Sequence, residues 1–175
     1  MCDHSHCNVR VDSLRQTLAE LDFERGIWSA ALDGNLVKVL NFLEKGLDPS
    51  IRDSSGYTPL HYAARNGHGE VCKLLLSFQA EPNAQTPGGA TPLHRAALQG
   101  HVDIISLLLK HGAEPSVSDS DGKTPLHKAA EGQHFSVASV LLKASTSLKQ
   151  CCDNRGLTPA NYVDSKNVTL LNLLS

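Results

Sequence analysis

The feature that most constrains this fold is a tetrapeptide that recurs at a fixed interval. Thr-Pro-Leu-His occupies residues 58–61, 91–94 and 124–127, each copy 33 residues after the one before. A weaker copy, Thr-Pro-Ala-Asn, follows at 158–161, and Trp-Ser-Ala-Ala at 28–31 continues the register upstream. A period of this length indicates a repeat protein, in which each unit packs only against its neighbours.

The same interval relates residues outside the tetrapeptide. Agreement at so many positions shows that the period describes a whole structural unit. The matching positions are Gly34, Gly67 and Gly100; His68, His101 and His134; Leu43, Leu76, Leu109 and Leu142; and Pro49, Pro82 and Pro115.

Local chemistry predicts two short helices and a turn in each unit. Asp-x-x-Gly at 53–56 is typical of a turn, because glycine readily adopts a positive φ. Thr58 suits a helix N-cap, and Pro59 suits the first helical position, whose N–H has no partner within the helix. Gly67 ends this helix, and apolar residues at 71–75 predict the inward face of a second one.

Helices of about eight residues are too short to be stable alone in water. They must therefore bury their apolar faces against neighbouring units, and the array folds as a stack. Small alanine pairs at 63–64, 96–97 and 129–130 allow adjacent helices to approach closely. We expect an all-α fold without strands.

The pattern D-x-x-G-x-TPLH-x-AA-x-x-GH followed by a leucine run resembles the ankyrin repeat, which has the same period. The resemblance implies an all-α solenoid of stacked helix–turn–helix units with hairpin turns. We expect one domain over 11–175 after a flexible tail at 1–10. The repeats would span 24–52, 53–85, 86–118 and 119–152, with a truncated repeat at 153–175.

Both ends carry apolar residues that predict capping helices. An N-terminal helix is expected over 11–22, where Val11, Leu14, Leu18 and Leu21 have helical spacing. It would cover the exposed face of the first repeat near Trp28. The C-terminal cap would use Leu170, Leu171, Leu173 and Leu174.

Four departures interrupt the pattern. Thr86 stands where the turn aspartate is expected, and Gln79 stands where the next repeat has glycine. Gly132 comes one residue early for ending a helix, and one extra residue precedes Asp153. We expect these changes to alter local geometry in the last repeats without changing the fold.

The resemblance also implies a function, which is to bind a partner protein through a concave surface made of turn tips and first helices. Arg65, Arg95 and Lys128 would form a positive ladder there that favours an acidic or extended segment. A solvated polar face without a ligand is the alternative. The candidate contact residues are Tyr57, Tyr62, Arg65, Asn66, Arg95, Leu98, Gln99, Lys123, Lys128 and Glu131.

Composition and charge narrow the function class further. The formal net charge is -2, so there is no basic excess for nucleic acid. Apolar runs are far shorter than the ~20 residues of a membrane span, and the first residues have no secretory signal. Five cysteines, an odd number, favour a reducing compartment. We expect a cytoplasmic or nuclear monomer that acts as a small adaptor.

The residues that could take part in catalysis or bind a cofactor do not form a pattern that predicts an enzyme. The nine histidines fall mostly on repeat positions, where the resemblance implies structural hydrogen bonds. Nucleophile elbows, phosphate-binding loops and paired carboxylates are missing from the sequence. The alternative function is a metal-binding or redox role for Cys2, His4, His6 and Cys7, whose spacing departs from usual zinc sites. The resemblance also marks Asn83 as a candidate for asparaginyl hydroxylation.

Overall fold

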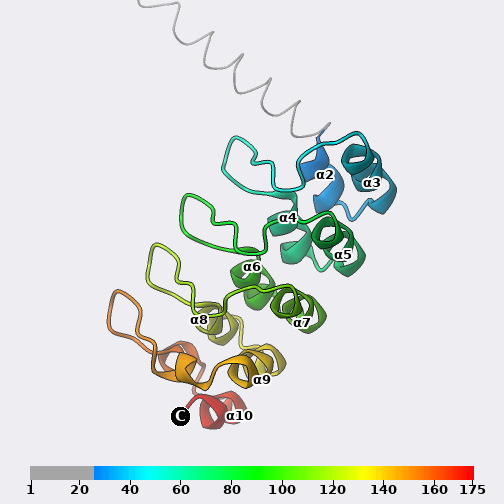
Figure 1. The fold of residues 1–175 in the computed structure, drawn as a ribbon. Helices are drawn as coiled ribbons and strands as arrows, with labels where there is room; N and C mark the ends of the chain where they lie inside the picture. The colour runs from blue at the N-terminus through cyan, green and yellow to red at the C-terminus, as the bar shows by residue number, and fades with distance from the viewer. Residues whose placement is uncertain (1–25) are drawn as a thin grey trace, which may run out of the picture.

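The computed structural model describes residues 26–175 (Figure 1). This part of the chain is helical and contains no strand. Its elements, in chain order, are α2 (Ile27–Leu32), α3 (Leu36–Glu44), α4 (Pro59–Asn66), α5 (Gly69–Ser77), α6 (Pro92–Gln99), α7 (Val102–Lys110), α8 (Pro125–Glu131), α9 (Phe135–Ala144), the 3-10 helices η2 (Thr146–Gln150) and η3 (Pro159–Tyr162), and α10 (Val168–Leu174).

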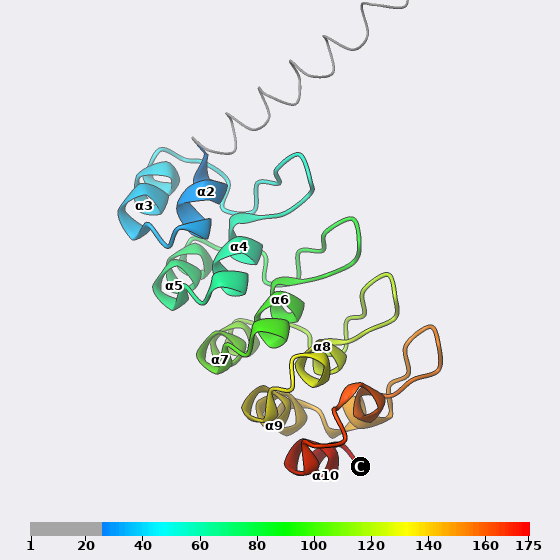
Figure 2. The same ribbon diagram turned by 180° about the vertical axis from the view of Figure 1, so that it is seen from behind.

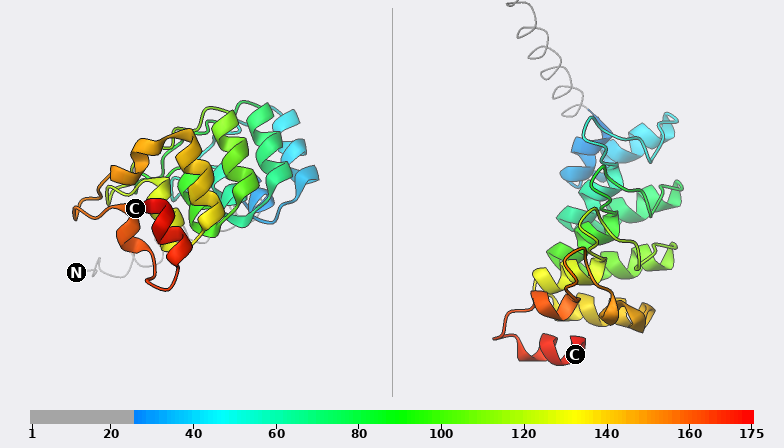
Figure 3. Two further views of the ribbon diagram at one scale, coloured as in Figure 1. Left: turned by 90° about the horizontal axis from the view of Figure 1, so that it is seen from below. Right: turned by 90° about the vertical axis from the view of Figure 1, so that its left-hand side faces the viewer.

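The helices form two rows in a single stack. The first helices α2, α4, α6 and α8 make one row, and the second helices α3, α5, α7 and α9 make the other (Figure 1). Long hairpins project beside the first row, which is also visible from behind (Figure 2) and from the side (Figure 3). The expected all-α solenoid of helix–turn–helix units is confirmed. We call the face formed by the hairpins and first helices the concave surface.

Each first helix begins with a reciprocal capping box. In α4, the Nδ1 atom of His61 lies 2.9 Å from Thr58 Oγ1 and accepts a hydrogen bond from the Thr58 backbone N–H at 3.2 Å. The Thr58 side chain in turn accepts from the backbone of His61. The same box opens α6 and α8, and in η3 Asn161 replaces the histidine. Proline at the first helical position needs no hydrogen-bond acceptor, which explains the recurring Thr-Pro.

The ends of the first helices require a left-handed residue. Gly67 and Gly100 both adopt φ 83° there. At the end of α8, Gln133 adopts the left-handed conformation, with φ 60°, whereas Gly132 is right-handed, with φ −77°. The early glycine therefore does not shift the repeat. An added Cβ at Gly132 would lie 2.6 Å from the Leu98 carbonyl oxygen, so this position needs glycine for space.

The core is one continuous apolar cluster along the stack. Leu60, Leu93 and Leu126 from the tetrapeptides are fully buried. All six alanines of the pairs at 63–64, 96–97 and 129–130 are also fully buried. Because these small side chains fill the contact between neighbouring first helices, the distance between the helices depends on alanine.

We expect Ala97→Leu to destabilise the protein by about 1–3 kcal/mol, because a larger side chain overpacks a filled contact. The free energy of unfolding from urea titration measures the effect. Ala144→Leu is the control, since Ala144 is exposed at the end of α9. An equal effect of the two substitutions would contradict the proposed close packing.

The C-terminal end closes with shorter elements. The weak tetrapeptide copy forms only the 3-10 helix η3, which packs on α8. Helix α10 then contacts α9 and buries Leu170 and Leu174. The capping helix expected over 11–22 and the tail expected at 1–10 lie outside the described residues. Within 26–175, none of the helices has the length and hydropathy needed to span a bilayer.

Candidate functional site

Each hairpin of the concave surface is organised by its first side chain. Asp53 Oδ1 accepts hydrogen bonds from the backbone N–H groups of Ser55 (2.9 Å) and Tyr57 (2.8 Å). Asp119 and Asp153 accept the equivalent pair of bonds in their own hairpins. Thr86 has one hydroxyl oxygen and accepts from the Ala90 N–H alone, at 3.2 Å. The hairpin that begins at Thr86 is therefore built differently from the other described hairpins.

The second carboxylate oxygen of each aspartate binds the residue that follows the tetrapeptide. The hydroxyl of Tyr62 donates to Asp53 Oδ2 at 2.6 Å, and the hydroxyl of Tyr162 donates to Asp153. Lys128 Nζ lies 3.1 Å from Asp119 Oδ2. Each of these three side chains is thus held by the turn of its own repeat.

Arg95 occupies the same position but has no such carboxylate, because its hairpin begins with Thr86. Its guanidinium reaches the preceding repeat instead and donates from Nη2 to the Tyr57 hydroxyl. The guanidinium carbon also lies 5.1 Å from the centroid of the Tyr57 ring, within cation–π range. Arg95 Nε is buried and has no hydrogen-bond partner. Arg95 therefore links two repeats and remains incompletely hydrogen-bonded.

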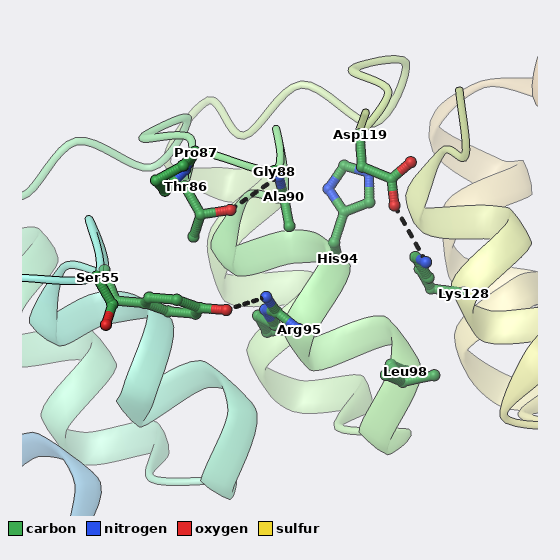
Figure 4. A pocket seen from close by; sticks show the side chains of 11 residues that line it. Ser55, Thr86, Pro87, Gly88, Ala90, His94, Arg95, Leu98, Asp119 and Lys128 are labelled. Carbon is green, nitrogen blue, oxygen red and sulfur yellow. Dashed lines mark hydrogen bonds and ion pairs between the residues drawn. The ribbon is translucent and has the colours of Figure 1, made fainter. Parts of the chain in front are cut away.

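These side chains border a hollow of about 380 Å³ between successive hairpins and α6 (Figure 4). Polar and apolar groups share its wall. The lining residues are Ser55, Tyr57, Thr86, Pro87, Gly88, Ala90, His94, Arg95, Leu98, Asp119 and Lys128. The lining residues come from three successive repeats, those that begin at 53, 86 and 119.

Ion pairs balance most of the charge beside the hollow. Lys123 pairs with Glu131, and Lys128 lies 3.6 Å from the other oxygen of Glu131 as well as beside Asp119. Burial opposes ionisation of Asp119, but the Lys123 backbone N–H and the Lys128 ammonium group outweigh it and lower the carboxyl pKa. The hydrogen bond from Lys123 to Glu131 raises the pKa of that lysine. The two lysines are therefore matched by two carboxylates.

The structure brings together most of the residues predicted from the sequence. Tyr57, Arg95, Leu98 and Lys128 line the hollow directly. The ring centroid of Tyr62 lies 5.5 Å from that of Tyr57. Lys123 and Glu131 join the site through their ion pairs with each other and with Lys128.

Other predicted residues lie apart from the hollow. Arg65 and Gln99 are exposed near the ends of α4 and α6. Asn66 is also exposed, and its amide donates to the Leu32 carbonyl of the preceding repeat at 2.8 Å. Asn83 donates to the Gly112 carbonyl and accepts from the Glu114 N–H, so both ends of its amide are hydrogen-bonded. Its hydroxylation remains a prediction.

Sequence reasoning missed several residues that border the hollow or hold its side chains in place. Asp119 and Pro87 border the hollow, and Asp53 fixes Tyr62 beside it, yet none was a candidate. The absent turn aspartate at position 86 was visible from the repeat alignment. Its consequence for Arg95 depends on side-chain reach across the hairpin, which spacing alone does not give.

Six histidines at repeat positions connect neighbouring repeats by hydrogen bonds, and the structural role implied for them by the family pattern is confirmed. With Nδ1 accepting the capping bond, the Nε2 atoms of His61, His94 and His127 face the carbonyl oxygens of Ala90, Lys123 and Leu157 in the next repeat. Burial lowers the pKa of His61 and of His94 to about 4. A second set, His68, His101 and His134, binds the carbonyls of Leu32, Arg65 and Leu98 in the preceding repeat.

The three cysteines of residues 26–175, Cys72, Cys151 and Cys152, form no disulfide. Cys72 is fully buried in the core, and burial raises the pKa of its thiol to about 12. Between residues 26 and 175 there is no group of three or more histidine, cysteine or acidic side chains placed to hold a metal ion. Cys2, His4, His6 and Cys7, proposed as a metal or redox cluster, lie outside this range.

Comparison with known proteins gives partial but consistent matches. The chain is 54% identical to human ankyrin repeat domain-containing protein 39 over 80 residues, which cover 46% of this chain and 42% of that protein. The cattle protein of the same name is 64% identical over 55 residues, covering 31% and 30% of the two chains. The chain thus spans less than half the length of these curated relatives.

The repeat itself is what distant matches share. A mouse 2-5A-dependent ribonuclease is 43% identical over 54 residues, which is 30% of this chain and only 7% of that enzyme. The family model for three copies of ankyrin repeats matches residues 27–119, more than half of the chain, and a second ankyrin model matches 99–142. The matched ranges coincide with the helix pairs and hairpins described above. This chain belongs to the ankyrin-repeat family.

Proposed function

We propose that this chain is a non-catalytic interaction module, a small adaptor that binds an acidic or extended segment of a partner protein on its concave surface. Ankyrin repeats generally mediate protein–protein interaction. The observation that supports this surface in particular is the hollow lined by Tyr57, Arg95, Leu98 and Lys128. In the proposal the adaptor is a cytoplasmic or nuclear monomer that uses neither nucleic acid nor a membrane.

The residue types around the hollow suit protein recognition. Tyrosine and arginine are the side chains that most often contribute large shares of binding energy at protein interfaces. Here the Tyr57 and Tyr62 rings lie side by side, and Arg95 is held against Tyr57. Half-buried Leu98 adds apolar area on the same helix as Arg95. A partner would gain contact without ordering these side chains first.

Charge reversal tests the proposed surface. We expect Arg65→Glu combined with Arg95→Glu to reduce capture of partner proteins from cell lysate at least about tenfold, since two favourable charges become repulsive. Captured proteins are quantified by mass spectrometry against the wild-type chain. Circular dichroism should show an unchanged helical spectrum.

A matched control keeps the net charge change but moves it to another face. Lys110 and Lys143 are exposed on the second helices α7 and α9. The variant Lys110→Glu with Lys143→Glu should capture the same partners as the wild type. Equal loss in both double variants, or no loss in either, would show that the concave surface is not the binding site.

A further inference from the structure

We propose that the hollow beside Arg95 is a subsite for one glutamate or aspartate side chain of an extended partner segment. Arg95 is the residue that binds this carboxylate. The inference rests on the proposed function, because it assumes that the partner lies along the concave surface, and it specifies what the partner must carry there.

The repeats differ in whether the residue after the tetrapeptide has a carboxylate partner. Three repeats pair the residue after the tetrapeptide with their own turn aspartate, through Tyr62–Asp53, Lys128–Asp119 and Tyr162–Asp153. In the repeat at 86–118, Thr86 replaces the turn aspartate, and the residue after the tetrapeptide is Arg95. Among the four residues at this position, arginine binds a carboxylate most strongly. A carboxylate position is thus left open in one repeat only of the described array.

The charged side chains beside the hollow favour a ligand group that carries a single negative charge. Lys123 and Lys128 are balanced by Asp119 and Glu131. Arg95 has no ion-pair partner within the described residues, so its guanidinium charge is not paired with a carboxylate of this part of the chain. A carboxylate would neutralise it. A phosphate group would bring a second negative charge close to Asp119, which disfavours a phosphorylated segment.

The guanidinium is already positioned for this role. Arginine has five N–H donors, and the only hydrogen bond of the Arg95 side chain in the described residues goes to the Tyr57 hydroxyl. The Tyr57 ring fixes the orientation of the group, and Arg95 Nε lies buried without a partner. Because the side chain is held before binding, little rotamer entropy is lost when a carboxylate arrives.

The repeat pattern supplies the decisive variant. Thr86→Asp restores the aspartate found in the other hairpins, where its Oδ1 accepts two backbone N–H groups and its Oδ2 binds the side chain after the tetrapeptide. We expect the new carboxylate to pair with Arg95 from within the chain and so to exclude a carboxylate of the partner. Thr86→Asn has the same shape without the charge and is the comparator.

The probe is a displayed library of random twelve-residue peptides with both ends blocked, selected on the full-length chain. We expect the enriched peptides to share one acidic residue. The tightest peptide is then compared with its Glu→Gln or Asp→Asn counterpart by fluorescence anisotropy. Loss of the carboxylate should weaken binding about 10–100-fold on the wild type, as expected for a charged hydrogen bond. On Thr86→Asp the change should be less than about threefold, and on Thr86→Asn it should be clearly larger than on Thr86→Asp.

Several outcomes would overturn the subsite. Enriched peptides without an acidic residue, or a carboxylate effect that is the same in Thr86→Asp and in the wild type, would show that Arg95 does not bind this group. A library that enriches no peptide would equally reject it, because the hollow would not accept an extended segment. The proposed function has its own test in the Arg65 and Arg95 charge reversals, so it could stand when the subsite fails.

Discussion

Lowering the pH from 7.5 to 5 is expected to reduce the free energy of unfolding by about 4 kcal/mol, through His61 and His94 alone. Burial lowers the pKa of each ring from 6.5 to about 4 in the folded chain. At pH 5 the unfolded chain binds a proton at each site and the folded chain does not, which amounts to about 2 kcal/mol per ring. Burial also lowers the pKa of His127, which adds in the same direction.

The capping hydrogen bonds explain why the free energy of unfolding falls, and does not rise, as the pH is lowered. Nδ1 of each ring accepts from the backbone N–H of the N-cap threonine, so a proton on Nδ1 would set two donors against each other. Stability is therefore fully present above pH 6.5 and is lost as the pH falls toward 4. The lowered carboxyl pKa of Asp119 acts only at more acidic pH, because that group stays ionised at pH 5.

Urea titrations at the two pH values measure the effect, and the chain supplies a control. Asn161 replaces histidine in the fourth capping box and accepts from the Thr158 N–H at 2.8 Å. His94→Asn should therefore keep the cap and lose the bond to the Lys123 carbonyl. The variant should be less stable at pH 7.5, but its loss between pH 7.5 and 5 should be smaller by about 2 kcal/mol. Equal stability of the wild type at both pH values would contradict the neutral, buried state of these rings.

Gly100→Ala is expected to destabilise the chain by about 3 kcal/mol, through left-handed strain and a steric clash. Gly100 has φ 83°, and an added Cβ would lie 2.7 Å from the His134 ring. The ring would have to move away from the Leu98 carbonyl that it binds at 3.1 Å. One methyl group therefore strains the end of α6 and breaks a contact between repeats.

Gly112→Ala separates the two causes. Gly112 has the same φ of 83°, but apart from its two chain neighbours no residue has an atom within 4 Å of its added Cβ. The equivalent residue of the previous repeat is Gln79, which tolerates φ 65°. We expect Gly112→Ala to lower the free energy of unfolding by only about 1 kcal/mol. If both alanine variants unfold at the same urea concentration, the His134 contact does not matter for stability.

The fold was predictable because the repeat combines several independent local rules. Thr58 and Pro59 mark a helix start, Gly67 marks its end, and Leu60 shows which face is buried. Three near-identical copies then make accidental agreement negligible. The helix end at Gln133 was harder to predict from the sequence, since glutamine rarely adopts the left-handed conformation. Next to Gln133, the His134 ring is hydrogen-bonded to the Leu98 carbonyl and Gly132 has no room for a Cβ, and neither contact is visible in the sequence.

The candidate site was predictable only in part. Alignment of the repeats placed Tyr62, Arg95 and Lys128 on one surface, because a solenoid repeats the direction of equivalent side chains. Alignment did not show that Lys128 is neutralised by Asp119 while Arg95 turns toward Tyr57. Those contacts depend on side-chain length and on a single missing carboxylate, and neither is visible in the hydrophobic pattern.

The hairpin built on Thr86 also differs from its neighbours in its internal hydrogen bonds. The backbone N–H groups of Ser55, Asp121 and Arg155 are each tied to a turn aspartate, whereas the equivalent N–H of Gly88 has no acceptor in the described part of the chain. Gly88 is joined to the next hairpin through its carbonyl, which accepts from the Ser120 N–H at 2.9 Å. Its own N–H, on an exposed residue at the rim of the hollow, therefore offers a backbone donor that the other hairpins use up internally.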